Sequence, residues 1–268
     1  MRVEEQTVEL ILFVAGIVTV FFYLPVGKWS DKVGRKKPIV IGNFLALILL
    51  FPLFWAMGHL ANPGIAAAAK AAPVRVEGPA CTTDPFGELV GSTPSPCGKL
   101  LQTLVAGGVP YTIAKSDTLR LTVGGDEIAL PPQWMADNAA RKAGIEQALT
   151  RHGFDFAKQQ PPMASVIGII AILLVLGVLS ALTFGSAAAL LAELFPAKIR
   201  YSSMSIPYHI GAGYFGGFLP LIANYIVAKS GDAYAGLWYT WAFVLISLLV
   251  GIWGIPSGPP QDFAEDAR

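Results

Sequence analysis

One short segment carries most of the charge that could do chemistry in this chain. Residues 27–37 have the sequence G-K-W-S-D-K-V-G-R-K-K, in which Asp31 stands alone among five basic residues. A lone carboxylate beside an arginine can accept charge-assisted hydrogen bonds, or it can lie at a helix N-terminus. Gly34 can adopt the positive φ of a sharp reversal, and Pro38 suits the first turn of a following helix. The segment therefore predicts a tight, charged turn between two helices.

A second charged segment, residues 193–200, has the form E-x-F-P-x-x-x-R. We expect Glu193 to meet Arg35 of the first segment and Arg200 to meet Asp31. Such a network at the ends of packed helices can hold them in one conformation and release them in another. The plainer alternative is that these charges only anchor helix ends at a membrane surface, and both roles can hold at once.

Polar side chains inside long apolar runs are further candidates, here for a solute or proton path. They are Thr19 and Tyr23, then Ser180, Thr183 and Ser186, and finally Tyr208 and His209. Serine and threonine in membrane helices more often bond their own backbone or a neighbouring helix than a ligand. His209 is strongly titratable and can exchange a proton near neutral pH, which favours a role in the path. His209 lies near the start of its apolar run, however. It could therefore lie at shallow depth in the membrane and serve only as a hydrogen-bonding residue.

Other kinds of chemistry find no support in the sequence. We find no nucleophile beside a base, no suitably placed pair of carboxylates, no glycine-rich phosphate loop and no cluster of metal ligands. The formal net charge of +1 gives no reason to expect a nucleic-acid partner. We therefore expect neither an enzyme nor a chain that binds a metal or cofactor.

The distribution of apolar residues predicts a membrane protein. The chain is 54% hydrophobic and only 14% charged, and a bilayer core of roughly 30 Å needs about 20 apolar helical residues. Runs of that length cover residues 8–26, 38–60, 164–192, 204–228 and 235–256. The first run is too long for a cleaved signal peptide and is followed by a basic turn. We expect five transmembrane helices.

Basic residues in short loops predict the orientation of these helices. Five follow the first run, and Lys198 and Arg200 follow the third. Because lysine and arginine gather on the cytoplasmic side, both turns should be cytoplasmic. The N-terminus and residues 61–162 would then lie outside the plasma (inner) membrane, and the tail 257–268 inside.

The external segment 61–162 has the composition of a soluble domain. We expect a linker over 64–79, strands over 109–113 and 118–123, and a helix from Trp134 to His152 that stops at Gly153. Cys81 and Cys97 both lie in this segment, where a disulfide is favoured over free thiols. These features predict a small α+β insert.

The two charged segments resemble a known family. The pattern G-x-x-x-D-K-x-G-R-K from Gly27 to Lys36 is similar to the loop motif of the major facilitator superfamily, and residues 193–200 resemble the loop before its eleventh helix. The run Tyr201–Val227 is similar to the eleventh helix of the metabolite–proton symporters. Gly213 and Gly217 within it form a small-xxx-small pair that would allow close helix packing.

The resemblance implies an all-α integral membrane fold whose five spans correspond to helices eight to twelve of twelve. It divides the chain into spans and motif loop over 1–60, insert over 61–162, spans over 163–256 and tail over 257–268. The implied function is proton-coupled symport of a small organic solute by a fragment or a split subunit that pairs with a separate N-terminal half. The alternative is a membrane-anchored binding or sensing protein that acts through its insert.

Overall fold

Long apolar helices dominate the computed structural model, which describes residues 3–79, 81, 91–158, 160–196, 198–255 and 257. Four helices in this part are long and apolar enough to cross a membrane: Glu5–Val33, Lys36–Ala61, Met163–Glu193 and Arg200–Ser230. A further apolar helix, Leu237–Trp253, has 17 residues. At 1.5 Å per residue its length is about 25 Å, slightly less than the roughly 30 Å of a bilayer core. Four of the five predicted spans thus have the expected length, and the fifth stays a prediction.

The chain divides into two compact units. The helical unit comprises Glu5–Met57, Pro162–Leu219 and Tyr239–Arg268, and the sheet unit comprises Met1–Glu4, Gly58–Pro161 and Pro220–Trp238. The last of these segments joins the sheet unit although the sequence analysis did not predict it there.

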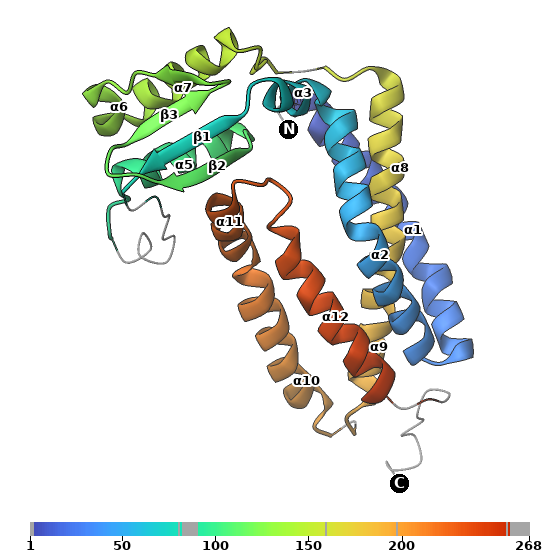
Figure 1. Ribbon diagram of the computed structural model, residues 1–268. Helices are drawn as coiled ribbons and strands as arrows, with labels where there is room; N and C mark the ends of the chain where they lie inside the picture. The colour runs from blue at the N-terminus through green and yellow to red at the C-terminus, as the bar shows by residue number, and fades with distance from the viewer. Residues whose placement is uncertain are drawn as a thin grey trace. The chain divides into compact units, whose positions relative to one another are not determined.

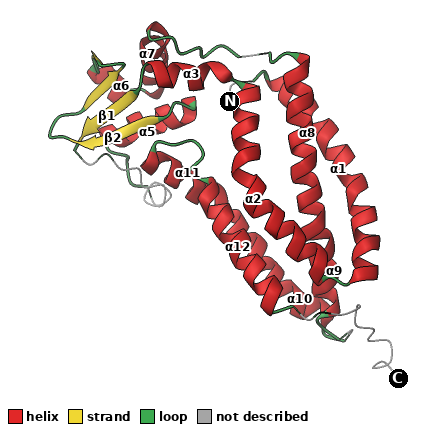
Figure 2. Ribbon diagram, turned by 45° about the vertical axis from the view of Figure 1, so that its right-hand side comes forward, coloured by secondary structure: helices red, strands yellow, loops and turns green. Residues whose placement is uncertain are grey.

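The helices of the helical unit are interrupted twice by π-helix. Its elements are α1 (Glu5–Val33), α2 (Lys36–Ala61, up to Met57), α8 (Met163–Ser180), η1 (Ala181–Gly185), α9 (Ser186–Glu193), α10 (Arg200–His209), η2 (Ile210–Gly216) and most of α12 (Leu237–Trp253). In Figures 1 and 2, α1, α2 and α8 run side by side. Each of the stretches η1 and η2 widens the backbone within a longer helix. Such π-helical bulges are frequent at functional sites.

The sheet unit is built on a four-stranded sheet in the order β2-β1-β3-β4. Its elements are α3 (Pro63–Ala71), β1 (Val74–Gly78), α5 (Pro96–Gly107), β2 (Tyr111–Lys115), β3 (Arg120–Val123), β4 (Asp126–Ile128), α6 (Pro132–Ala136), α7 (Asn138–Arg151) and most of α11 (Leu219–Ser230). Strand β1 pairs parallel with β2 and antiparallel with β3. A parallel neighbour requires a crossover, and α5 provides it between β1 and β2.

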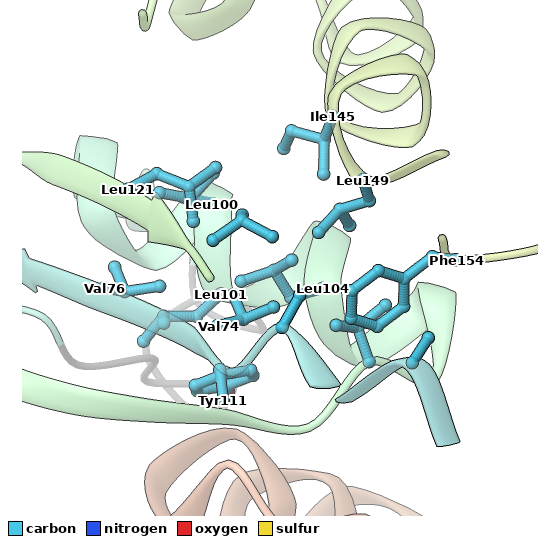
Figure 3. Close-up of a cluster of buried hydrophobic side chains, with 14 of the residues drawn as sticks. Val74, Val76, Leu100, Leu101, Leu104, Tyr111, Leu121, Ile145, Leu149 and Phe154 are labelled. Atoms are coloured by element: carbon cyan, nitrogen blue, oxygen red, sulfur yellow. The ribbon is translucent and has the colours of Figure 1, made fainter. Parts of the chain in front are cut away.

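Alternating side chains of the sheet place one face in a hydrophobic core. Val74 and Val76 of β1 are buried, whereas Arg75 between them is exposed. Helices α5 and α7 cover this face, as Figure 3 shows for Leu101 of α5 and Leu149 of α7. Burying a leucine or valine side chain contributes about 1.5–3 kcal/mol, so this core stabilises the sheet unit substantially.

The expected linker over 64–79 is wrong, because α3 and β1 lie within it. Alanine repeats give little periodicity, so the sequence concealed that Ala68 and Ala72 pack into the core. The two predicted strands are confirmed as β2 and β3, with β2 starting at Tyr111.

The helix predicted from Trp134 to His152 is two helices, α6 and α7. It breaks at Asp137, whose Oδ1 accepts a hydrogen bond of 2.9 Å from the backbone N–H of Ala139 and caps α7. Gly153 follows with φ 87°, which is the left-handed conformation expected of a helix stop.

The predicted disulfide between Cys81 and Cys97 is confirmed. It links the chain beyond β1 to the first turn of α5, and its sequence separation is 16 residues. A cross-link of that span restricts the unfolded chain and stabilises the folded sheet unit by about 3 kcal/mol.

Candidate functional site

The charged turn between α1 and α2 is set by one glycine. Gly34 has φ 89°, and its N–H donates to the carbonyl of Ser30 over 3.0 Å. This conformation strains any residue with a Cβ, so Gly34 ends α1 at Val33 and lets α2 begin at Lys36. Arg35 is thereby held in the turn, where its side chain can reach both α1 and another helix.

Arg35 forms the predicted ion pair with Glu193 at the end of α9. Its Nε and Nη2 both donate to Oε1 of Glu193, over 2.9 and 2.7 Å. The side chains are 11% and 21% exposed, respectively. The hydrogen bonds to Glu193 raise the pKa of Arg35, and the positive charge is therefore fixed. Charge-assisted hydrogen bonds of this kind are stronger than hydrogen bonds between neutral groups. They strengthen further where the surroundings exclude water and the dielectric constant is low.

The third nitrogen of the Arg35 guanidinium donates hydrogen bonds to residues at the end of α1. Its Nη1 donates to Oγ of Ser30 over 2.8 Å and also to the carboxylate of Asp31. Ser30 is fully buried, while the side chain of Asp31 is 59% exposed. The sequence analysis did not single out Ser30; its position directly before the acid and five residues before Arg35 was the available signal.

The expected pair between Arg200 and Asp31 is wrong. Nε of Arg200 instead donates to the carbonyl of Phe195 over 3.2 Å, which closes its own loop. Asp31 is already bonded by Arg35 within one helical turn, and this local pairing costs less ordering than a distant one.

Lys36, the next residue of the motif, caps a different helix. Its Nζ donates to the carbonyl of Ile252 over 2.7 Å. The last carbonyls of a helix have no partner within the helix, and a lysine there is favourable for the helix dipole. The turn at Gly34 thus ties together the ends of α1, α9 and α12.

Three of the predicted path residues lie together between α1 and α8. The hydroxyls of Tyr23 and Ser180 are hydrogen-bonded over 3.1 Å. Thr19, one turn before Tyr23, packs against Gly177, where an added Cβ would collide with its side chain. These polar groups therefore contribute to interhelical packing, which was the commoner role expected of them.

Thr183 bonds within its own helix. Its hydroxyl donates to the carbonyls of Leu179 and Ser180, each over 3.1 Å. Its methyl group faces Gly42 of α2, where an added Cβ would lie 2.9 Å from Cγ2. The hydroxyl satisfies carbonyls beside η1, which supports the irregular backbone there.

Replacing Gly177 with Val is expected to push α1 and α8 apart, because the new side chain would occupy the volume of Thr19. Overpacking of this kind destabilises by about 1–3 kcal/mol. Thermal unfolding in detergent would measure the loss. Gly16→Val is the control on α1, since among the described residues no atom outside the adjoining backbone lies within 4 Å of a Cβ added there. Equal melting temperatures for the two variants would contradict this account of the interface.

His209 lies exposed near the end of α10. Its Nδ1 is 2.8 Å from the carbonyl of Ser205 and 3.4 Å from the hydroxyl of the same residue. The ring of Tyr208 meets it edge to face, with centroids 5.7 Å apart. His209 therefore bonds to its own helix and contacts Tyr208, as expected if its role is only that of a hydrogen-bonded residue near the start of its apolar run. Its role in a solute or proton path stays a prediction.

Gly213 and Gly217 were expected to allow close helix packing, and Gly27 begins the loop motif. In the part of the chain described, no atom lies within 4 Å of a Cβ added at any of them. None of the most apolar stretch of Arg200–Ser230 is buried. The packing role of Gly213 and Gly217 therefore remains a prediction.

A polar pair that the sequence analysis missed joins α2 and α12. Asn43 is 5% exposed, and its Nδ2 donates to Oγ of Ser247 over 2.9 Å. A lone amide within the run I-V-I-G-N-F-L-A was the signal that could have found it. Ser186, which was predicted as part of the polar stripe, is fully buried, and its hydroxyl has no hydrogen-bond partner among the described residues.

Metal chemistry has no visible site in this structure. Within the described ranges, no three side chains of His, Cys, Asp or Glu are grouped so that they could hold an ion.

Comparisons with known proteins point to transport. Over 85 residues the chain is 36% identical to a Staphylococcus aureus (strain COL) protein described as "Putative proline/betaine transporter", a stretch of 32% of this chain and 17% of that protein. Over 81 residues it is 30% identical to a citrate-proton symporter of Klebsiella pneumoniae, covering 30% of this chain and 18% of the symporter. No family model and no solved structure matches.

Each match therefore spans less than a fifth of the relative's length. The matched proteins are named as transporters, one of them as a proton symporter. Together with the four helices long enough to cross a bilayer, these similarities identify a multi-pass membrane protein that is similar to transporters.

Proposed function

We propose that this chain is the C-terminal part of a secondary transporter of the major facilitator superfamily, within the metabolite–proton symporter group. It would carry helices eight to twelve of that fold and take part in proton-coupled symport of a small organic solute. The relatives named for proline, betaine and citrate support solutes of that size and polarity.

The observation that carries this proposal is the ion pair between Arg35 and Glu193. It joins the turn after the first span to the end of the third, and its partners come from the two motifs that resemble the family. A pair that links helix ends can hold one conformation of a transporter and break in the other. Gly27, Asp31, Gly34, Lys36 and Arg200 complete the proposed gating segment.

The orientation follows from the same charges. The turn at Gly34 and the loop before Arg200 would be cytoplasmic, with the tail 257–268 on the same side. The N-terminus and residues 61–162 would lie outside the plasma membrane, where the disulfide of Cys81 and Cys97 would be stable.

The solute and proton would pass along helices that carry the remaining candidates. Transporters of this kind bind their substrates near the membrane midplane, between two halves that rock about the site. Thr19, Tyr23, Ser180 and Thr183 would line or support that path, and Tyr208 and His209 would lie nearer one end. A separate N-terminal half would supply the opposite wall.

His209→Ala is expected to lower proton-driven uptake by about tenfold or more while the chain still inserts normally, because the exchangeable proton is lost. Uptake in membrane vesicles at several external pH values would measure this change. Ser202→Ala, on the exposed part of the same helix, is the control variant. Unchanged uptake and unchanged pH dependence in His209→Ala would remove this residue from the path.

A second candidate function is binding or sensing through the sheet unit. What favours it is that the sheet unit has a hydrophobic core of its own, which includes Val76, Leu101 and Leu121. The two functions differ in a simple measurement on the full chain. Binding of a radiolabelled solute that persists when the proton gradient is collapsed, without uptake into vesicles, would favour sensing over transport.

A further inference from the structure

The end of α2 is joined to α3 of the sheet unit by a very short connection. Only Asn62 separates the end of α2 at Ala61 from α3. Its side-chain Oδ1 accepts hydrogen bonds from the N–H groups of Gly64 and Ile65, over 3.1 and 3.4 Å, and so caps α3. Ile65 is part of the hydrophobic core of the sheet unit, so this short connection ties the end of α2 to that core.

Within the sheet unit, hydrogen bonds from Tyr111 join β2 to the end of α11. The backbone N–H of Tyr111, the first residue of β2, donates to the carbonyl of Gly231 over 3.1 Å. The hydroxyl of the same tyrosine donates to the carbonyl of Ala228 over 2.7 Å. Both acceptors lie at the C-terminal end of α11, where helix carbonyls lack partners within the helix. Tyr111 therefore caps α11 from a different part of the chain.

The ring of Tyr111 belongs to the hydrophobic core at the same time. The side chain is 5% exposed, and Figure 3 shows it at the side of the cluster that faces the ribbon of α11. Burial raises the pKa of its hydroxyl, which keeps the hydroxyl protonated and able to donate. A single side chain thus combines core packing with the hydrogen bond to the helix end.

The fit at Gly231 is too close for any other residue. It has φ 74°, and an added Cβ would collide with the backbone carbonyl of Tyr111. A second contact lies nearby, because a Cβ added at Gly58 near the end of α2 would collide with the hydroxyl of Tyr234. The loop after α11 thus touches α2 directly.

From these contacts we infer that residues 62–161 form a strap, joined covalently to the end of α2 and through Tyr111 to the end of α11, that prevents these two helix ends from separating. The strap is a property of the fold, independent of the proposed transport function. Its consequence for transport rests on that function: the ends of these two helices would have to move together when the external side opens.

Amide hydrogen exchange on the full chain in lipid nanodiscs tests the strap. In Gly231→Ala, exchange at the amide of Tyr111 and in the last turn of α11 is expected to rise about tenfold or more, because the close fit is lost. Gly125→Ala is the matched control, since Gly125 also has a positive φ, 98°, but in the described part of the chain no atom beyond its two neighbours lies within 4 Å of its added Cβ. Exchange in α5 should stay slow in both variants and shows that the core is intact.

Tyr111→Phe provides the second variant, because it keeps the ring in the core and removes only the hydrogen bond to Ala228. Faster exchange confined to the end of α11 is the expected result. The strap is ruled out if Gly231→Ala exchanges like the Gly125→Ala control. It is ruled out equally if Tyr111→Phe accelerates exchange in α5 as much as in α11, since Tyr111 would then be only a core residue. Neither outcome depends on whether the chain transports a solute.

Discussion

Replacing Arg35 with Gln is expected to destabilise the helical unit by about 2–4 kcal/mol, since it leaves a mostly buried carboxylate without its cation. Arg35 contributes both nitrogens that bond Glu193, together with the nitrogen that bonds buried Ser30. Urea unfolding of the chain in detergent micelles, followed by far-ultraviolet circular dichroism, would measure the change. We expect the variant to unfold at a clearly lower urea concentration than the parent chain.

A double-mutant cycle separates the ion pair from the other bonds of Arg35. Glu193→Gln alone should also destabilise, and the double variant should be less unstable than the sum of the two single changes. Asp31→Asn is the control on the same arginine, because Asp31 is 59% exposed and exposed pairs contribute at most about 1 kcal/mol. Strict additivity of the Arg35 and Glu193 changes would contradict a direct interaction.

Leu104→Ala is expected to destabilise the sheet unit by about 2–5 kcal/mol, because it leaves a cavity in a well-packed core. Leu104 is fully buried within the hydrophobic cluster on α5. Protease resistance of residues 91–158, measured across a urea titration of the chain in nanodiscs, reports the stability of this unit alone.

The same chemical change at Leu130 gives the comparison. Leu130 is only partly buried against the cluster, so Leu130→Ala removes fewer contacts and should cost less. If the two alanine variants lost resistance at the same urea concentration, the position of Leu104 at the centre of the core would be wrong. The turn at Gly34 should be unaffected by either change, since it lies in the helical unit.

The features that could be predicted from the sequence depend on local chemistry. A glycine with an obligatory positive φ, followed by an arginine, defines the turn at Gly34, and the structure has this turn. The pairing of Arg35 with Glu193 was also predicted, because both charged segments were expected on the same side of the membrane, where opposite charges can form charge-assisted hydrogen bonds. Long apolar runs predicted five spans, and four of the described helices have sufficient length, because the composition of such a run limits the structures it can form.

Features that depend on packing at a distance could not be predicted. Arg200 bonds to Phe195 because of the backbone path of its own loop, and no residue type encodes that path. Strand β1 could not be predicted because it follows an alanine-rich helix. The small residues of that helix give no clear hydrophobic periodicity in the sequence, although some of them pack into the core. The cap that Tyr111 places on α11 joins residues 117 positions apart, and it follows only from the folded sheet.

The central claim is that this chain takes part in proton-coupled transport of a small organic solute. Its most direct test is uptake of radiolabelled proline, betaine and citrate into membrane vesicles from the source cells, with the chain present, deleted or restored. The account predicts that uptake of at least one solute depends on the inward proton gradient, falls on deletion, returns with the parent chain and fails to return with Arg35→Gln. If uptake of all three solutes were the same with the chain present, deleted or restored, both with and without the proton gradient, the proposed transport function would be contradicted.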